Sequence, residues 1–183
     1  MANIAGLTAL AAGMQAYLVK FGFTTVVDFG WRARSSILNQ GPGGANRIVL
    51  VPGDPKSGKA GPLKRGRQAQ TNPRVLFEWD ALATLSIWGV DTTDTNDEKL
   101  QYAATVTLLE LAVRALQNAV DPITSTPVGV ANLTLGEPSW SVENTEMYFG
   151  RELLLPITQK GPLLDRPIGT IIPTPVVNRV PAT

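Results

Sequence analysis

The sequence predicts an α+β fold, in which two main helices pack on a mainly antiparallel sheet of about four strands. Three observations lead to this prediction. Two segments carry apolar residues at helical spacing, several shorter segments read as strands, and the order along the chain is helix, strand, long loop, strand, helix, two strands and an arm. Of the 183 residues, 1–160 are expected to form one domain with a basic loop inserted at 53–73, and 161–183 a Pro-rich extended arm.

The first third of the chain predicts one helix and two strands. Apolar residues recur at helical spacing from Ile4 to Phe21, and Gly22 is a natural helix stop. A short strand is expected at Thr24–Phe29, and a second at Arg47–Pro52, where proline ends the pairing. The segment between these strands mixes arginines with a flexible GPGG and is assigned no element.

The middle of the chain predicts a loop, a strand and the strongest helix. Residues 53–73 contain Gly, Pro, Lys and Arg with almost no apolar residue, and Val75–Val90 then alternate as a strand does. A helix is expected from about Asp97 to Val120. Thr95 and Glu98 have the capping-box spacing at its start, and acidic residues suit the positive end of the helix dipole.

This helix carries two apolar stripes, and Asp-Pro ends it at 121–122. The first stripe consists mostly of small residues and suits packing on a sheet: Leu100, Ala103, Ala104, Leu108, Leu111, Ala112, Ala115 and Leu116. The second lies beside it and needs another cover: Tyr102, Val106, Leu109 and Val113.

Two further strands are expected, at Val128–Leu135, with Val142 as the furthest end, and at Met147–Ile157. The second is apolar on both faces at residues 153–155, which indicates an internal strand, and Pro156 is expected to end its pairing. The last 23 residues contain five prolines and cannot form a core of their own.

The chain has no histidine and no cysteine. It therefore lacks a His general base, a Ser-His-Asp triad, a cysteine nucleophile, a disulfide framework and His- or thiolate-ligated metal sites. We predict that it is not an enzyme and uses no cofactor.

Charged residues make up 17%, below the typical quarter, which indicates that part of the surface is covered in an oligomer. No apolar run approaches the ~20 residues of a membrane span, and the apolar N-terminus lacks the Lys or Arg of a signal peptide, so synthesis in the cytosol is expected.

Two motifs resemble ligand sites and are rejected. GDPKSGKA at 53–60 nearly matches a phosphate-binding loop, but Ala60 replaces the magnesium-binding hydroxyl and Gly-Pro follows where a helix must begin. The acidic cluster Asp91, Asp94, Asp97 and Glu98 lacks the glycine and the spacing of a calcium loop, and is interpreted as a helix-capping turn. Trp79, Trp88 and Trp140 lie in or beside expected strands, so core or interface packing is the default interpretation.

The near-neutral net charge of +1 conceals a division. Residues 47–74 contain seven Lys or Arg and one Asp, a net charge of +6. Residues 75–121 contain eight Asp or Glu and two Lys or Arg, a net charge of −6. The basic loop is suited to duplex nucleic acid, or equally to the acidic face of a neighbouring copy or partner ring. A solvated loop without function is the third possibility.

Several segments in this order resemble the tail terminator (tail completion) proteins of long-tailed bacteriophages, over roughly Ile4 to Gln159. They are WRAR, NQGPGGANRIVLVPGD, NPRVL, LSIWGVD, DEKLQYAATVTLLELAVRAL, GEPSW and FGRELLLPIT. The resemblance implies a small subunit of a six-fold ring that stops growth of the tail tube and meets the connector of the head. It carries over no catalytic motif and no site residue.

From this resemblance and the patterns above, we expect a structural virion protein, assembled in the host cytoplasm and located at the head-proximal end of the tail. Its expected partners are other copies of itself, the tail tube protein and a head-side connector or stopper protein, with genome DNA passing through the lumen without sequence-specific contact and no membrane. The alternatives are another head-to-tail connector or neck ring protein, or a nucleic-acid-binding module. The expected interface residues are Lys56, Lys59, Lys64, Arg65, Arg67, Tyr102, Val106, Leu109, Val113, Ile171, Ile172, Val176 and Val177.

Overall fold

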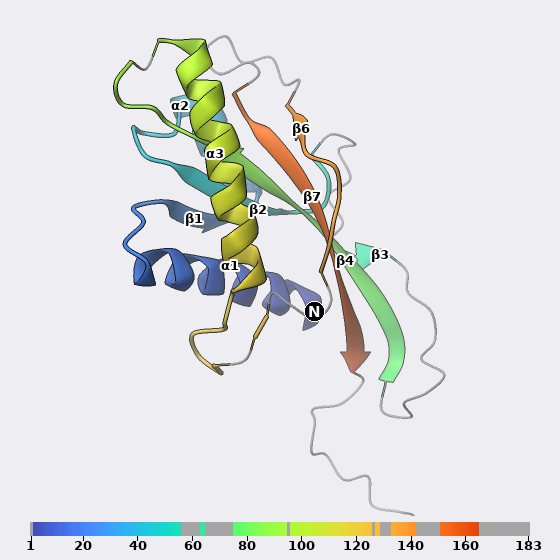
Figure 1. The fold of residues 1–183 in the computed structure, drawn as a ribbon. Coiled ribbons are helices and arrows are strands. Elements are labelled where there is room, and N and C mark those ends of the chain that lie inside the picture. The colour runs from blue at the N-terminus through green and yellow to red at the C-terminus, as the bar shows by residue number, and fades with distance from the viewer. Residues whose placement is uncertain are drawn as a thin grey trace, which may run out of the picture.

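The structure, a computed structural model, describes residues 2–55, 63–64, 75–94, 96–125, 127–128, 133–141 and 151–164. Three helices pack on one mixed sheet, which confirms the predicted α+β class (Figure 1). The helices are α1 (Ala2–Lys20), α2 (Trp31–Gln40) and α3 (Glu98–Gln117). The strands are β1 (Val26–Phe29), β2 (Arg47–Pro52), β3 (Leu63–Lys64), β4 (Val75–Trp88), β5 (Leu133–Leu135), β6 (Ser139–Trp140) and β7 (Leu153–Leu164).

The sheet has the strand order β1-β2-β4-β7-β5, with β3 beside β4 and β6 beside β7. β1 and β2 are parallel, because α2 connects them as a crossover, and the other pairs are antiparallel. The sheet has more strands than the about four expected: the described sheet has seven, two of which are only two residues long. The predicted mainly antiparallel character holds for all pairs except the one at the β1 edge.

Helix α2 is an element that the sequence pattern does not predict. It is bounded by Gly30 and Gly41, both of which have positive φ angles of 100° and 79°. Its fully buried residues are Ile37 and Arg34, and Trp31, Ala33 and Leu38 are partly buried beside them, so a charged residue interrupts the apolar stripe. The helix forms because the sheet and a buried partner for Arg34 support it.

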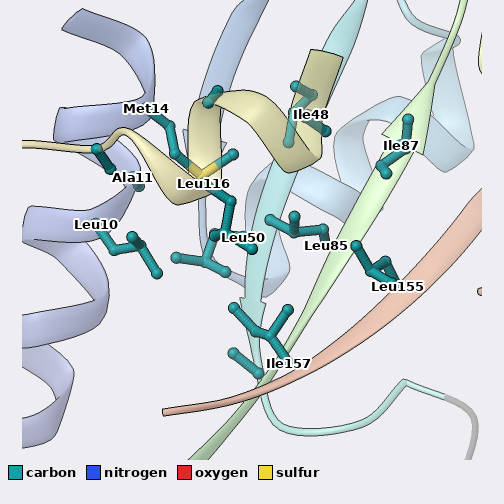
Figure 2. Packing of buried hydrophobic residues seen from close by; sticks show 14 of the residues in the cluster. Leu10, Ala11, Met14, Ile48, Leu50, Leu85, Ile87, Leu116, Leu155 and Ile157 are labelled. Atoms are coloured by element: carbon teal, nitrogen blue, oxygen red, sulfur yellow. The ribbon is translucent and has the colours of Figure 1, made fainter. Parts of the chain in front are cut away.

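The two faces of the sheet carry separate hydrophobic cores. Residues alternate between the faces along each strand, so Ile48 and Leu50 of β2 face α1 and α3, while Val49 and Val51 face α2. The larger core lies under α1 and α3, and Figure 2 shows its central residues converging from both helices and three strands: Leu10, Ala11, Met14, Ile48, Leu50, Leu85, Ile87, Leu116, Leu155 and Ile157.

Two glycines let backbone segments approach closely around this core. A Cβ on Gly89, just after β4, would lie 2.2 Å from the backbone nitrogen of Thr105 in α3. A Cβ on Gly13 of α1 would lie 2.8 Å from the backbone oxygen of Val120. Both distances are far below van der Waals contact, so these positions accept only glycine without a shift of the backbone.

The start and the buried side of α3 differ from the prediction. The N-cap is Asp97 and not Thr95, since Asp97 Oδ1 accepts the N–H groups of Lys99 at 2.8 Å and Leu100 at 3.4 Å. Ala103 of the predicted core stripe is exposed, whereas Gln101 and Thr105 are buried. These polar residues bind the backbone after β4, which apolar periodicity does not predict.

Strand β7 is internal, as predicted, but Pro156 does not end its pairing. The register continues from Pro156 opposite Thr84 to Leu164 opposite Val75. The carbonyl oxygen of Pro156 accepts the N–H of Gly136 at 2.7 Å, so its nitrogen points to the same side, away from β4 and toward the gap between β5 and β6. No β4 bond is lost there. Because β7 reaches Leu164, the strand includes the first four residues of the segment assigned to the arm.

Candidate protein–protein interface

A buried cluster of polar side chains lies between α2 and the sheet. Arg34 donates from Nε to Glu152 Oε1 at 2.6 Å and from Nη2 to Oε2 at 2.7 Å. Ser86 donates to the same carboxylate at 2.5 Å and accepts from Trp88 Nε1 at 2.8 Å. All four residues are buried, with at most 3% of their surface exposed. A closed cluster of this kind holds α2 on the sheet and offers no access to a ligand.

The acidic segment before α3 uses its carboxylates to fix turns. Asp91 and Asp94 each accept the N–H group two residues ahead, at 2.7 Å and 2.9 Å. The hydrogen bond from the Thr93 N–H lowers the pKa of Asp91 below its ordinary value. Within the described parts of the chain, no three potential ligands are grouped to hold a metal ion. The interpretation as a capping turn agrees with these contacts.

The second apolar stripe of α3 is only partly covered within one copy. Leu109 and Val113 are half-buried and pack against the larger core. The ring of Tyr102 stacks edge-to-face on Trp140 from β6, with centroids 5.0 Å apart and an interplanar angle of 69°. Val106, one turn after Tyr102, remains 48% exposed. The stripe therefore has a cover at each end and an open stretch between them.

Strands β5 and β6 extend this apolar surface along the edge of the sheet. Leu135 lies opposite Ile157, and Trp140 lies opposite Leu153. Since both β7 residues belong to the core under α1 and α3, Leu135 and Trp140 lie on that same face. Their side chains are 41% and 37% exposed. We call the following four residues the α3–β6 surface: Tyr102, Val106, Leu135 and Trp140.

A second exposed apolar surface lies at the end of α1. Val19, Phe21 and Phe23 are 63%, 58% and 44% exposed, although Phe21 was expected on the buried side of the helix. Phe23 also lines a pocket of about 340 Å³ between the start of β1 and α3. Its other walls include Thr25, Asn46, Leu108, Glu110, Leu111 and Arg114. We call Val19, Phe21, Phe23 and this pocket the α1-end surface.

The two surfaces lie on different sides of α3. The α3 residues Thr107, Glu110 and Arg114 line the pocket, and each follows one residue of the second apolar stripe. One residue corresponds to a rotation of about 100° around the axis of an α-helix. The two surfaces therefore face in different directions, and α3 contributes residues to both: to one together with β5 and β6, and to the other together with the end of α1 and the start of β1.

The structure describes only part of the interface expected from the sequence. Tyr102, Val106, Leu109 and Val113 lie together on α3, as their spacing predicts. Lys64 lies in β3, opposite Asp80 in the register with β4. The other expected residues lie outside the described residues: Lys56, Lys59, Arg65, Arg67, Ile171, Ile172, Val176 and Val177.

Sequence reasoning missed Leu135 and the exposed end of α1. Leu135 was assigned to a strand but not to a surface, since its face depends on the register with β7. Phe21 has the helical spacing of a core residue, but α1 ends at Lys20, and Phe21 lies exposed in the turn that follows. Val19, Phe21 and Phe23 lie on both sides of the helix stop Gly22, and this position was the sequence signal that they could be exposed.

Comparisons with known protein families and with curated protein sequences find no match to this chain. Among the described residues, no helix is both long and apolar enough to cross a membrane.

Proposed function

We propose that this chain is a structural subunit of a homo-oligomeric ring of six copies, of the kind formed by phage tail terminators. The observation that carries the proposal is the presence of two non-equivalent apolar surfaces on different sides of α3. A closed ring uses a heterologous interface, in which one patch of each copy meets a different patch of the next. A chain with two unlike exposed apolar surfaces has the parts that such an interface needs.

The size and composition of the domain are compatible with this proposal. A domain of this length has a radius of gyration of about 16 Å, so six copies in a ring would enclose a hole wide enough for duplex DNA. Exposed aromatic residues such as Phe21 and Trp140 are typical of the buried centre of interfaces. The resemblance of the sequence to tail terminators is the reason for proposing that the ring caps a phage tail tube.

In this role, the ring works by capping and not by chemistry. One face of the ring pairs with the last ring of the tail tube and removes the site on which the next tube ring would assemble. The opposite face meets a connector or stopper protein on the head side. The chain would then act in the virion, at the head-proximal end of the tail.

Light scattering after size-exclusion chromatography tests the proposal, alone and with tail tubes from the phage that encodes the chain. We expect a mass of six copies, or rings on tube ends seen by electron microscopy when the free chain is monomeric. Tubes assembled without the chain should exceed their normal length. Failure to form rings both with and without tubes would refute the proposal. Binding to head connectors but not to tubes would instead support a neck ring protein.

The charge division supports a second candidate, a nucleic-acid-binding module that uses the basic segment 47–74. Its net charge of +6 favours contact with phosphates, which is strongly salt-dependent. The test replaces Lys64, Arg65 and Arg67 by Ala and measures duplex DNA binding at several salt concentrations. A weaker affinity and a shallower salt dependence would support this candidate, and unchanged binding would exclude the loop as a DNA contact.

A further inference from the structure

The two apolar surfaces carry charges of opposite sign at their edges. Glu137 is exposed and lies between β5 and β6, the strands that carry Leu135 and Trp140. At the end of α1, Lys20 is exposed, and its Nζ lies 6.0 Å from the centre of the Phe21 ring. The pocket beside Phe23 is edged by one further cation and one anion, Arg114 and Glu110. Lys20 and Arg114 outweigh Glu110, so the α1-end surface carries a net positive charge. The α3–β6 surface has the negative charge of Glu137 between β5 and β6.

This arrangement disfavours contact between two identical surfaces. A two-fold dimer pairs each surface with itself, so Glu137 would find neither Lys20 nor Arg114 of the other copy opposite it. Like charges brought together at an interface are unfavourable, whereas opposite charges guide association and fix the register. The unlike surfaces therefore fit each other better than each fits itself.

The apolar parts of the two surfaces also match in kind. One presents the partly exposed side chains of Trp140 and Leu135 on short strands held by β7. The other presents the exposed side chains of Phe21 and Phe23, and Phe23 lines a pocket of about 340 Å³ with Leu108 and Leu111 in its wall. Aromatic residues that pack into a pocket at the centre of an interface contribute most of its binding energy.

We propose that neighbouring copies of this chain associate head-to-tail, with the α3–β6 surface of one copy on the α1-end surface of the next. Leu135 and Trp140 then pack against Phe21 and Phe23 of the neighbour, and Glu137 lies opposite Lys20 and Arg114. The partner at both surfaces is a second copy of the same chain. This inference rests on the proposed ring, and it specifies which residues join its subunits.

Engineered cysteines test this contact directly, because the natural chain contains none. Phe21→Cys and Leu135→Cys replace exposed side chains on the two surfaces, so both variants are expected to fold, and Trp140 and Phe23 remain in place to form the contact. A chain with both substitutions should give, after mild oxidation of assembled protein, a ladder of covalent oligomers up to the closed ring. Each single variant alone should give no ladder, and a mixture of the two single variants should give dimers that contain one chain of each.

The control pairs Leu135→Cys with Ile123→Cys, since Ile123 is 90% exposed and belongs to neither surface. This pair should remain monomeric on a non-reducing gel. Rings that form without a ladder from the Phe21 and Leu135 pair would overturn this contact while leaving the proposed ring intact. A ladder without closed rings would support the contact and contradict the ring. Dimers formed by either single variant alone, in place of the ladder, would show a two-fold interface and overturn the proposal.

Discussion

The two faces of the sheet differ in how completely one copy of the chain covers them. On the α2 face, Arg34, Glu152, Ser86 and Trp88 form a buried cluster in which both carboxylate oxygens accept hydrogen bonds. On the α1 and α3 face, the core is closed, but large apolar residues remain exposed on two sides of α3. Among the described residues, the first face is therefore covered within one copy, although the indole N–H of Trp31 is buried without a hydrogen-bond partner. The second has surface left over that another molecule is suited to cover.

The largest expected effect comes from breaking the ion pair on the α2 face. Arg34→Met leaves the carboxylate of Glu152 buried without its cation, and such a loss costs about 3–5 kcal/mol of unfolding free energy. Urea denaturation followed by circular dichroism measures it. The matched control is Arg32→Met on the exposed side of α2, which should change stability by less than about 0.5 kcal/mol. Equal effects of the two variants would contradict a special role for the buried pair.

On the face covered by α1 and α3, the corresponding test of stability is Gly89→Ala. The added methyl group would collide with the backbone of α3, and overpacking of this kind costs about 1–3 kcal/mol, with a larger value expected where backbone must move. Thermal unfolding of the variant measures the loss. Gly44→Ala is a useful comparison, because its positive φ angle of 74° is strained for alanine while no atom lies within 4 Å. A Gly89 variant as stable as the natural chain would contradict the close contact between β4 and α3.

Exposed residues of the α3–β6 surface should separate stability from association. Val106→Lys places a charge on a half-exposed position, so the unfolding free energy should change by no more than about 0.5 kcal/mol. The same variant should form far fewer oligomers, since the charge would be buried at the interface. Light scattering and denaturation of the same sample measure both quantities. If Val106→Lys associates as well as the natural chain, the claim that this exposed surface serves association is contradicted.

The smallest expected effect is a pH dependence at the end of α3. A hydrogen bond from the N–H of Ile123 lowers the pKa of Asp121 below its ordinary value. A carboxyl group with a depressed pKa in the folded state stabilises the fold above its unfolded pKa, and this contribution is lost as pH falls through the folded pKa. Asp121→Asn should therefore be slightly less stable than the natural chain near neutral pH, and equally stable at strongly acidic pH. Denaturation curves at both pH values test this, and a difference that persists in acid would contradict it.

The sequence was sufficient to predict α1, β2, β4 and α3, because their apolar patterns are long or bounded by clear stop signals. Helix α2 was missed because a buried Arg34 stands where a core apolar residue would mark the helix, and its partner Glu152 is 118 residues away. Pro156 misled the prediction of β7, since its effect depends on which neighbour its nitrogen faces. These features rest on pairing between distant segments, which periodicity in one segment does not reveal.

The candidate interface was predictable to a similar extent. The stripe from Tyr102 to Val113 was identified from helical spacing, and its need for a cover follows from the same pattern. Trp140 as the partner of Tyr102, and Leu135 as its neighbour on the sheet edge, require the register of β5 and β6 on β7. The α1-end surface requires knowledge of where α1 stops contacting the sheet.

The most direct test of the head-to-tail contact is a reversal of charge on one surface, on the other, and on both. Glu137→Lys alone, and Lys20→Glu with Arg114→Glu, should each reduce the oligomeric fraction by about tenfold or more, while Arg32→Glu on α2 should leave it unchanged. A chain carrying all three interface reversals should regain oligomers, because opposite charges again face each other. Light scattering at matched concentrations gives the result. We predict that the combined variant recovers the oligomers that the partial reversals lose. Oligomers that are equally abundant in every variant, or that do not recover in the combined variant, would contradict the contact.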